Sequence, residues 1–371
     1  MPIFVGFNFS ITDIRMNFKK ILRTAVFAAA VALATVSCKK DEETAVAYLS
    51  GSLVFKAPGY VKTGSEVTFT ASGVTHPENK PLGLYYKVTP GMEKSDTLDV
   101  PFDPENGLSW TYTIGDEPQT YTVACYVFAT GYSASSSSQT MVSVSSRTDG
   151  TGSITGTDFN SGAYSSFTDE RDGKSYFTVT AGGREWFAQN LAYEEAVSDG
   201  ENDLGCGVPY VNSEAMADIF GIYYTQEQAR HACPDGWELP DGEAWLALAV
   251  EAAGNEGVSS DGFAVAGTFT GIAGALMTDA AFNTITMWEY WPQVKITNST
   301  GFSALSTGFA TVSGDTVPAF EAATQKAVFW TADTEGDTGL YHYITVDNPD
   351  IYSGYGYESM AASLRCVKSA N

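Results

Sequence analysis

The sequence predicts a multidomain chain in which an N-terminal β-sandwich precedes a mixed α+β domain. Between residues 45 and 145, short segments alternate apolar and polar side chains, as half-buried strands do. Residues 146–168 are dominated by Gly, Ser and Thr and show no apolar period. Beyond residue 169, stretches with a helical apolar period join further strand patterns. A length of 371 residues leaves room for two such domains.

The first 37 residues have the features of a secretory signal peptide. Basic residues follow Met16, an apolar run covers 25–36, and Ser37 precedes Cys38. The run is shorter than the roughly 20 apolar residues that a permanent membrane helix needs. Because Cys38 directly follows a small residue, the site resembles a lipobox, which implies lipid attachment at Cys38. An ordinary signal peptide with an unrelated cysteine is the alternative, and whether residues 1–15 are translated stays open.

Residues 38–44 form the expected lipidated acidic tether. Lys39 and Lys40 are followed by the acidic run 41–43. Such a run behind a lipidated cysteine resembles the surface-export signal of Bacteroidetes lipoproteins. The resemblance implies an outer-membrane lipoprotein exposed at the cell surface, which touches the membrane through its lipid anchor only. A plain solvated tether is the alternative.

The charge balance excludes nucleic acid as a partner. The formal net charge is −24, and removing residues 1–37 leaves 16 Lys and Arg against 43 Asp and Glu, a net charge near −27. A field of this sign repels phosphate backbones. Charged residues are only 17% of the chain and hydrophobic ones 44%, which is typical of a folding sequence and not of a disordered acidic one.

Residues 45–145 are predicted to form an immunoglobulin-like β-sandwich. The segments 66–72, 84–88 and 121–128 alternate, and Pro-, Gly-, Asn- and Asp-rich turns separate them. About 100 residues and six or seven strands suit this fold. The segments 64–69 and 121–144 are similar to bacterial Ig-like and polycystic-kidney-disease-type repeats, which implies a spacer. Cys125 shares a strand face with Val123 and Val127, so we expect a buried, unreactive thiol.

Residues 146–168 are predicted to be a flexible Gly/Ser/Thr linker, because nothing in their composition favours a helix or a strand. Such a linker would let the following domain sample a range of distances from the membrane.

The C-terminal domain, residues 169–371, is expected to mix helix and strand. Residues 177–180 are strand-like, and Gly182 with Gly183 indicates a hairpin turn. One helix is expected at 226–233. A second begins after Asp241, a plausible N-cap, and places Trp245, Leu248, Ala249 and Ala252 on one face. The remainder is expected to be loops and short strands.

Several motifs of this domain occur together in one known family. They are Glu185-Trp186-Phe187-Ala188-Gln189-Asn190-Leu191, Gly221-Ile222-Tyr223-Tyr224-Thr225, Cys233-Pro234-Asp235-Gly236-Trp237-Glu238-Leu239-Pro240, Gly301-Phe302-Ser303-Ala304-Leu305, Val328-Phe329-Trp330-Thr331-Ala332 and Ser363-Leu364-Arg365-Cys366-Val367. Their order resembles the Fibrobacter succinogenes major paralogous domain, although Gln226 replaces the usual Trp and 306–308 depart from Pro-Gly-Gly. The resemblance implies an extracellular module with a C-type-lectin-like α+β fold.

The resemblance also bears on the cysteines and aromatic residues. Four cysteines remain after Cys38, and the sequence alone leaves three full pairings open. The lectin-like fold implies a disulfide between Cys233 and Cys366, which leaves the state of Cys206 open. Aromatic residues on short strands are expected to supply buried area. Those assigned to the core are Trp186, Trp237, Trp245, Phe302 and Trp330.

No pattern in the sequence predicts catalysis, a metal or a cofactor. The three histidines, His76, His231 and His342, do not have a metal-ligand spacing, and no nucleophile elbow, phosphate loop or dinucleotide fingerprint occurs. The loop 198–203 offers several oxygen atoms but not the calcium pattern of an EF-hand, so a solvated loop is favoured. The chain is therefore expected not to be an enzyme; the related formylglycine-generating type of enzyme is a weak alternative.

The segment 287–293 is the candidate binding site. Trp288, Tyr290 and Trp291 lie there, and exposed aromatic side chains stack on sugars and anchor protein interfaces. The alternative is that all three belong to the core. Thr97 and Thr316 each follow an Asp in tripeptides that resemble a Bacteroidetes O-glycosylation motif.

Taken together, these features predict a surface lipoprotein that presents a non-enzymatic, lectin-like module for adhesion or binding to an extracellular glycan. The alternative is a structural or assembly component that binds another protein of the envelope.

Overall fold

The chain is β-rich, and strands outnumber helices throughout. The computed structural model describes residues 46–91, 96–101, 108–157, 159, 161–254, 268–288, 294–314 and 317–368. The chain divides into two compact units, residues 1–47 and 48–371. The fold below is that of the second unit, together with Ala47 of strand β1.

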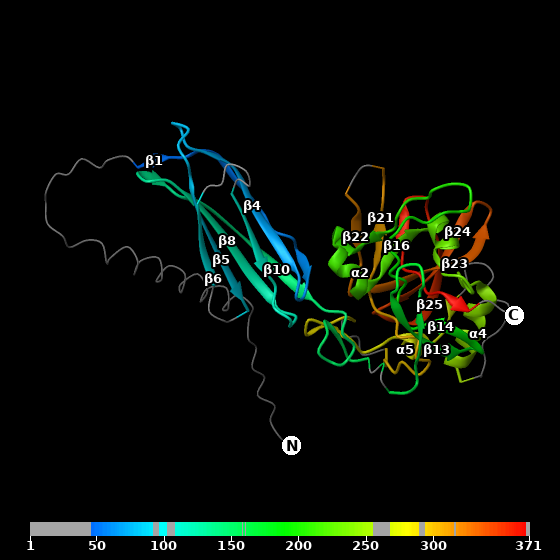
Figure 1. The fold of residues 1–371 in the computed structure, drawn as a ribbon. Helices are drawn as coiled ribbons and strands as arrows, with labels where there is room; N and C mark the ends of the chain where they lie inside the picture. The colour runs from blue at the N-terminus through cyan, green and yellow to red at the C-terminus, as the bar shows by residue number, and fades with distance from the viewer. Residues whose placement is uncertain are drawn as a thin grey trace, which may run out of the picture. The chain divides into compact units, whose positions relative to one another are not determined.

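The described residues from 47 to 144 form a two-stranded sheet, β1-β9, and two larger sheets that share one core. The five-stranded sheet has the order β3-β10-β8-β5-β6 and the three-stranded sheet the order β2-β4-β7; strands β4, β5, β8 and β10 are labelled in Figure 1. The bounds are β1 Ala47–Tyr48, β2 Ser50–Lys56, β3 Tyr60–Lys62, β4 Glu66–Thr75, β5 Gly83–Pro90, β6 Asp96–Pro101, β7 Leu108–Thr113, β8 Thr120–Phe128, β9 Tyr132–Ser133 and β10 Ser135–Val144. The alternation expected on β4 and β8 is confirmed, because Val67, Phe69, Val123 and Val127 are buried.

Part of the expected linker is paired with the domain that follows. Strand β11 (Ile154–Thr155) is antiparallel to β19 (Ala281–Phe282), and β12 (Ser165–Thr168) is antiparallel to β13 (Ser175–Ala181). The expectation of a flexible linker is therefore wrong for β11, which has two residues, and for β12, which has four. Composition misses them because these strands carry no apolar period, and because the partner of β11 is more than 120 residues away in sequence.

The described residues of the C-terminal domain form four sheets together with β11 and β12, which precede it. Their orders are β12-β13-β14-β27-β17, β15-β16-β26-β21-β22, β18-β25-β24-β23 and β11-β19-β20. The remaining bounds are β14 Arg184–Phe187, β15 Val208–Pro209, β16 Ile222–Thr225, β17 Trp237–Glu238, β18 Thr268–Phe269, β20 Ile285–Thr286, β21 Phe309–Thr311, β22 Ala319–Glu321, β23 Lys326–Glu335, β24 Thr338–Thr345, β25 Asn348–Tyr355, β26 Met360–Ala362 and β27 Val367–Lys368. The last strand, β27, lies between β14 and β17, so the chain end closes the first sheet.

Both expected helices are present, and two further α-helices accompany them. The helical segments are η1 Tyr210–Asn212, α2 Glu214–Phe220, α3 Gln226–Ala232, α4 Gly242–Ala252 and α5 Ala273–Leu276. Asp241 caps α4 as expected, because its carboxylate accepts a hydrogen bond of 2.9 Å from the Ala244 amide. Helix α2 was expected to be loop. Five of its seven residues are buried, so it lacks the amphipathic period that identifies a helix.

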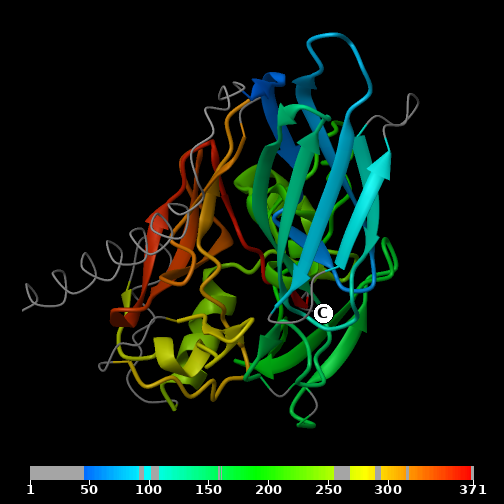
Figure 2. The same ribbon diagram turned by 90° about the vertical axis from the view of Figure 1, so that its left-hand side faces the viewer.

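The longest strands of this domain, β23, β24 and β25, form one antiparallel sheet, coloured orange to red in Figure 2. The expectation of only short strands is wrong here. On β24, Leu340, His342 and Ile344 are buried while Tyr341 and Tyr343 are half-buried. A histidine within the apolar set conceals this alternation in the sequence.

Candidate functional site

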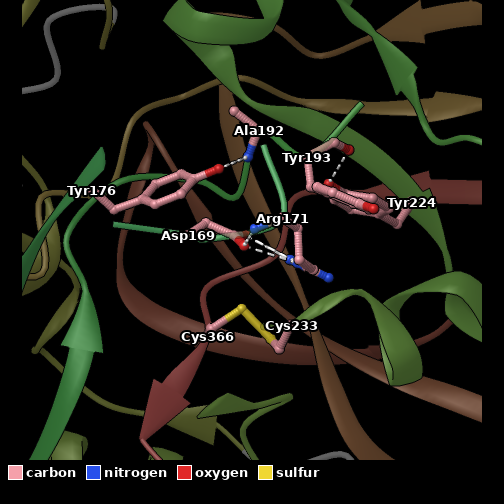
Figure 3. The surroundings of a disulfide bond; sticks show 8 residues. All are labelled: Asp169, Arg171, Tyr176, Ala192, Tyr193, Tyr224, Cys233 and Cys366. Carbon is pink, nitrogen blue, oxygen red and sulfur yellow. Dashed lines mark hydrogen bonds and ion pairs between the residues drawn. A yellow bond between two sulfur atoms is a disulfide. The ribbon is translucent and has the colours of Figure 1, made fainter. Parts of the chain in front are cut away.

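The disulfide implied by the family resemblance is confirmed. Cys233, directly after α3, is bonded to Cys366, directly before β27, across a sequence separation of 133 residues (Figure 3). The Cα atoms are 5.8 Å apart. Cys366 is fully buried, and its carbonyl accepts a hydrogen bond of 2.9 Å from the Phe187 amide. The bond thus ties the end of a helix to an interior strand of a sheet.

The polar groups near this disulfide form hydrogen bonds with one another. Arg171 donates to both carboxylate oxygens of the fully buried Asp169, and its guanidinium lies 3.9 Å from the centre of the Tyr193 ring (Figure 3). The Tyr224 hydroxyl donates to the Tyr193 carbonyl at 2.8 Å. Each of these groups is occupied by a structural contact, so the arrangement stabilises the fold and offers no reactive centre.

The two described cysteines outside the disulfide differ in exposure. Cys125 is fully buried, as expected, and burial raises the pKa of its thiol to about 12, which keeps the thiol protonated and unreactive. Cys206 is free and exposed. The state of Cys206, which the sequence left open, is therefore a free thiol.

The structure does not place the expected binding residues on one surface. Trp288 is 1% exposed, and its indole donates to the Ala304 carbonyl at 3.2 Å. This residue therefore belongs to the core, and the expectation that it contacts a ligand is wrong. Tyr290 and Trp291 lie outside the described residues. Thr97 lies in β6 opposite Lys87, in a strand whose side chains are not described. Thr316 and Cys38 lie outside the described residues.

The aromatic residues assigned to the core are confirmed there. Trp186, Trp245, Phe302 and Trp330 are at most 2% exposed, and Trp237 is 7% exposed. The rings of Trp186, Trp245 and Phe302 lie 5.4–5.7 Å apart, mostly edge to face. Such contacts supply core packing and leave no ring face for a ligand.

A buried cation occupies the centre of the C-terminal domain. The Arg365 side chain is fully buried, and its guanidinium donates to the carbonyls of Phe187, Phe302 and Ser303 and to the side-chain oxygen of Asn190. Burial lowers the pKa of Arg365 to about 9. Because these acceptors are neutral and belong to two segments far apart in sequence, 187–190 and 302–303, Arg365 acts as a structural connector.

Nothing in the described part of the chain brings together three or more side chains able to hold a metal ion. In the loop 198–203, the Asp199 carboxylate accepts hydrogen bonds from the amides of Glu201 and Asn202 and from the Asn202 side chain. These bonds lower the pKa of Asp199 to about 2. The loop is thus folded around its own carboxylate.

One half-buried surface combines aromatic rings with polar groups. Tyr341 and Tyr343 of β24 and Tyr352 of β25 lie on the side of the sheet opposite Ile344 and Ile351. Tyr341 and Tyr343 are partly buried there against a second core cluster, which contains Trp330. We call these three residues the tyrosine face. The ring centres of Tyr343 and Tyr352 are 5.5 Å apart at an interplanar angle of 25°, and those of Tyr341 and Tyr343 are 5.9 Å apart. The three rings therefore form a continuous row.

A hollow of about 340 Å³ adjoins this row. It lies within the size range of small-molecule sites. Its lining consists of Gln325, Lys326, Tyr343, Thr345, Val346, Asp347, Asn348 and Tyr352. The Lys326 ammonium lies 5.5 Å from the centre of the Tyr343 ring. Two amides, a hydroxyl and a carboxylate thus surround the rings, and they can donate to or accept from a polyhydroxylated ligand.

The hydroxyls of Tyr341 and Tyr352 keep their protons at neutral pH, because the pKa of each is raised. Desolvation by burial, and to a lesser extent the neighbouring Tyr343 and Tyr357, raise the pKa of Tyr341. Desolvation by nearby atoms, and then the negative charge of Asp350, raise the pKa of Tyr352. The phenols therefore remain neutral hydrogen-bond donors, and the nearby carboxylates disfavour an anionic ligand.

Sequence reasoning missed the tyrosine face, although a signal exists. Tyr341 and Tyr343 are two residues apart, which places both on one side of a strand. The turn at 346–347 then brings Tyr352 opposite Tyr343. Predicting that Tyr343 and Tyr352 lie opposite each other requires the strand register of the hairpin. A β-bulge between Ile344 and Thr345 shifts that register, and the sequence does not reveal the bulge.

The described residues contain no helix that is both long and apolar enough to span a membrane. A comparison with curated proteins finds no match. The family model of the Fibrobacter succinogenes major domain matches residues 179–368 and so spans β13 to β27, the disulfide, Arg365 and the tyrosine face. As this match covers more than half of the chain, the protein belongs to the Fibrobacter succinogenes major domain family.

Proposed function

We propose that this protein is a non-enzymatic binding protein of the cell surface, and that its tyrosine face binds an extracellular glycan. The observation that carries the proposal is the row formed by Tyr341, Tyr343 and Tyr352 beside a polar hollow. Tyrosine rings pack against the apolar faces of sugar rings, while amides and carboxylates bond the hydroxyl groups. A half-buried row of rings held by paired strands provides both with little reorganisation.

The rest of the proposal concerns the setting of this face. We infer that Cys38 carries the lipid, that residues 45–145 act as an Ig-like spacer, and that the C-terminal domain is C-type-lectin-like. The signal-peptide pattern, the lipobox and the acidic tether support an outer-membrane lipoprotein exposed at the surface. The two-sheet arrangement of the first domain supports the spacer.

A glycan array probed with the lipid-free chain, residues 39–371, tests the proposal. We expect reproducible binding to a subset of glycans, with loss of about tenfold or more when Tyr343→Ala and Tyr352→Ala are combined. The chain offers a matched control, because Tyr85 and Tyr126 form a similar cross-strand pair on β5 and β8 with ring centres 5.6 Å apart. Their double alanine variant should bind as the parent does.

Two results would oppose the glycan proposal. If the array is blank while the chain is folded, the same aromatic face is better assigned to contact with an envelope protein, the second function that tyrosine-rich surfaces serve. If binding survives loss of both tyrosines, the ligand contacts a different surface. Cross-linking from Tyr352 in cells then identifies any envelope partner.

A further inference from the structure

A second, more enclosed cavity is lined by residues of the C-terminal domain and by residues that precede it in sequence. Its volume is about 510 Å³, within the range of ligand sites. One wall is formed by residues 145–148 with Ile154, Thr157 and Phe159, which we call the strap. The opposite wall includes Tyr176 and Phe177 of β13 and Gln189. The strap precedes the family domain in sequence, so the cavity combines residues from inside and outside that domain.

The strap is held in place by specific contacts. The Ser153 amide donates to the Ser145 carbonyl at 2.8 Å, and the Asn283 amide donates to the Ser153 carbonyl at 2.9 Å. The Thr157 and Thr278 hydroxyls are hydrogen-bonded. The Phe159 ring stacks on Phe177 with centres 4.6 Å apart and planes 6° apart. The cavity is therefore pre-formed, which reduces the entropy that a ligand must lose on binding.

The charges in the cavity wall are already compensated. The Lys174 ammonium donates to the Ala192 carbonyl and the Glu194 carboxylate, both at 2.6 Å, and lies 3.1 Å from the Asp218 carboxylate. These three acceptors use all three of its donors. Arg147 is paired with Glu117 at 3.0 Å. An ionic ligand would lose hydration on entry without gaining an unpaired counter-charge.

Neutral hydrogen-bonding capacity remains open. The Gln189 side-chain oxygen accepts a hydrogen bond of 2.9 Å from the Phe177 amide, which fixes the orientation of the carboxamide. Its Nε2 has no protein acceptor among the described residues. Phe159, Phe177, Ile154 and Leu305 supply an apolar surface beside it. The wall therefore suits a ring with one apolar face and several hydroxyl groups.

We propose that this cavity is a second binding site, which takes a neutral saccharide of one or two rings. Gln189 Nε2 donates to a ligand hydroxyl or ring oxygen, and the apolar wall covers the C–H face of a sugar ring. The choice of a saccharide rests on the proposed glycan-binding function, whereas the enclosure and neutrality of the site do not. Because the strap forms one wall, the family domain alone is not sufficient for this site.

Saturation-transfer NMR on the lipid-free chain, residues 39–371, tests the site. The probes are a panel of neutral mono- and disaccharides with uronic acids and amino sugars as charged counterparts. We expect a neutral member to bind with a dissociation constant of about 1 mM or tighter. Gln189→Glu keeps the acceptor for the Phe177 amide but removes the donor, and should weaken binding about tenfold.

Ser146→Trp blocks the cavity from an exposed strap position, and Ser138→Trp on the exposed side of β10 is the matched control. Binding should be lost in the first variant and kept in the second, and it should persist in the Tyr343→Ala and Tyr352→Ala variant. That last result separates this site from the tyrosine face. Preference for a charged sugar, binding that survives Ser146→Trp, or the absence of any neutral binder would each overturn the proposal.

Discussion

Arg365 Nε donates a hydrogen bond of 2.7 Å to the side-chain oxygen of Asn190, although 175 residues separate the two. The Asn190 amide in turn donates to the Phe220 carbonyl at 2.8 Å and to the Ser363 hydroxyl at 3.2 Å. The Asn190 side chain thus orients the buried Arg365 guanidinium and forms a hydrogen bond with the last residue of α2. This pair connects two family motifs at the centre of the domain.

Removing either partner should destabilise the domain through unpaired buried groups. We expect Asn190→Ala to cost about 1–3 kcal/mol of unfolding free energy. Arg365→Met should cost more, about 3–5 kcal/mol, because three carbonyls lose their donor. Denaturant unfolding measures both, and a double-mutant cycle should give a coupling of about 0.5–3 kcal/mol. The control is the partly exposed ion pair of Arg184 with Glu238, which are 3.5 Å apart. Arg184→Ala should cost at most about 1 kcal/mol of unfolding free energy. If it cost as much as Arg365→Met, the connector role of Arg365 would be contradicted.

The disulfide should contribute substantially to stability. It closes a loop of 133 residues, for which chain entropy predicts about 5 kcal/mol before strain. We expect the Cys233→Ser and Cys366→Ser double variant to lose roughly 2–5 kcal/mol in chemical denaturation. Cys206→Ser, at the exposed free thiol, should behave as the parent does. Equal stability of all three proteins would show that the loop is constrained by other contacts.

The turn between β13 and β14 allows a matched pair of glycine substitutions. Gly182 and Gly183 both have positive φ, +60° and +71°, as a type I′ hairpin turn requires. A Cβ at Gly182 would lie 2.5 Å from the backbone of Ala247 in α4, whereas a Cβ at Gly183 meets nothing. Gly183→Ala should therefore cost about 1 kcal/mol and Gly182→Ala at least about 2 kcal/mol more. Thermal unfolding distinguishes them; equal costs would mean that α4 does not pack on this turn.

Stability should depend on pH through His342. This side chain is 1% exposed, it contacts Ser353 and the Trp245 ring, and burial lowers its pKa to about 3. Because the folded pKa lies below the unfolded one, stability is complete above about pH 6.5 and falls as the pH decreases toward 3. The loss should be roughly 3 kcal/mol between pH 7 and pH 4. His342→Leu should flatten this dependence and His231→Leu, at an exposed site, should not; parallel profiles would assign the effect to carboxylates instead.

Gly354 should control the shape of the tyrosine face. It lies opposite Tyr341 in the β24–β25 pair, and a Cβ there would be 2.5 Å from the Tyr341 ring. Gly354→Ala should displace the ring and weaken glycan binding several-fold, while stability changes by less than about 1 kcal/mol, since only the end of a side chain must move. Gly59→Ala, in open space on the first domain, is the control for calorimetric titration. Unchanged affinity would remove Tyr341 from the binding surface.

Local patterns in the sequence were sufficient for several features. Asp241 precedes an apolar helical period and caps α4, Gly182 and Gly183 predict the hairpin, and alternation predicts the core face of β8. The family motifs implied the bond between Cys233 and Cys366, which no spacing argument could choose among three pairings. These features depend on interactions within a few residues, or on a motif.

Tertiary structure decided the rest, for physical reasons that a linear pattern does not contain. Trp288 is buried, and the register of β24 with β25 places Tyr343 beside Tyr352, because burial and neighbours depend on which strands pair. The strap is ordered by distant partners such as Asn283, which its own Gly- and Ser-rich composition does not indicate. Arg365 is stable as a buried cation only because carbonyls from separate segments converge on it. The sequence by itself therefore determined the family and the local elements, and long-range pairing determined which surfaces are free to bind.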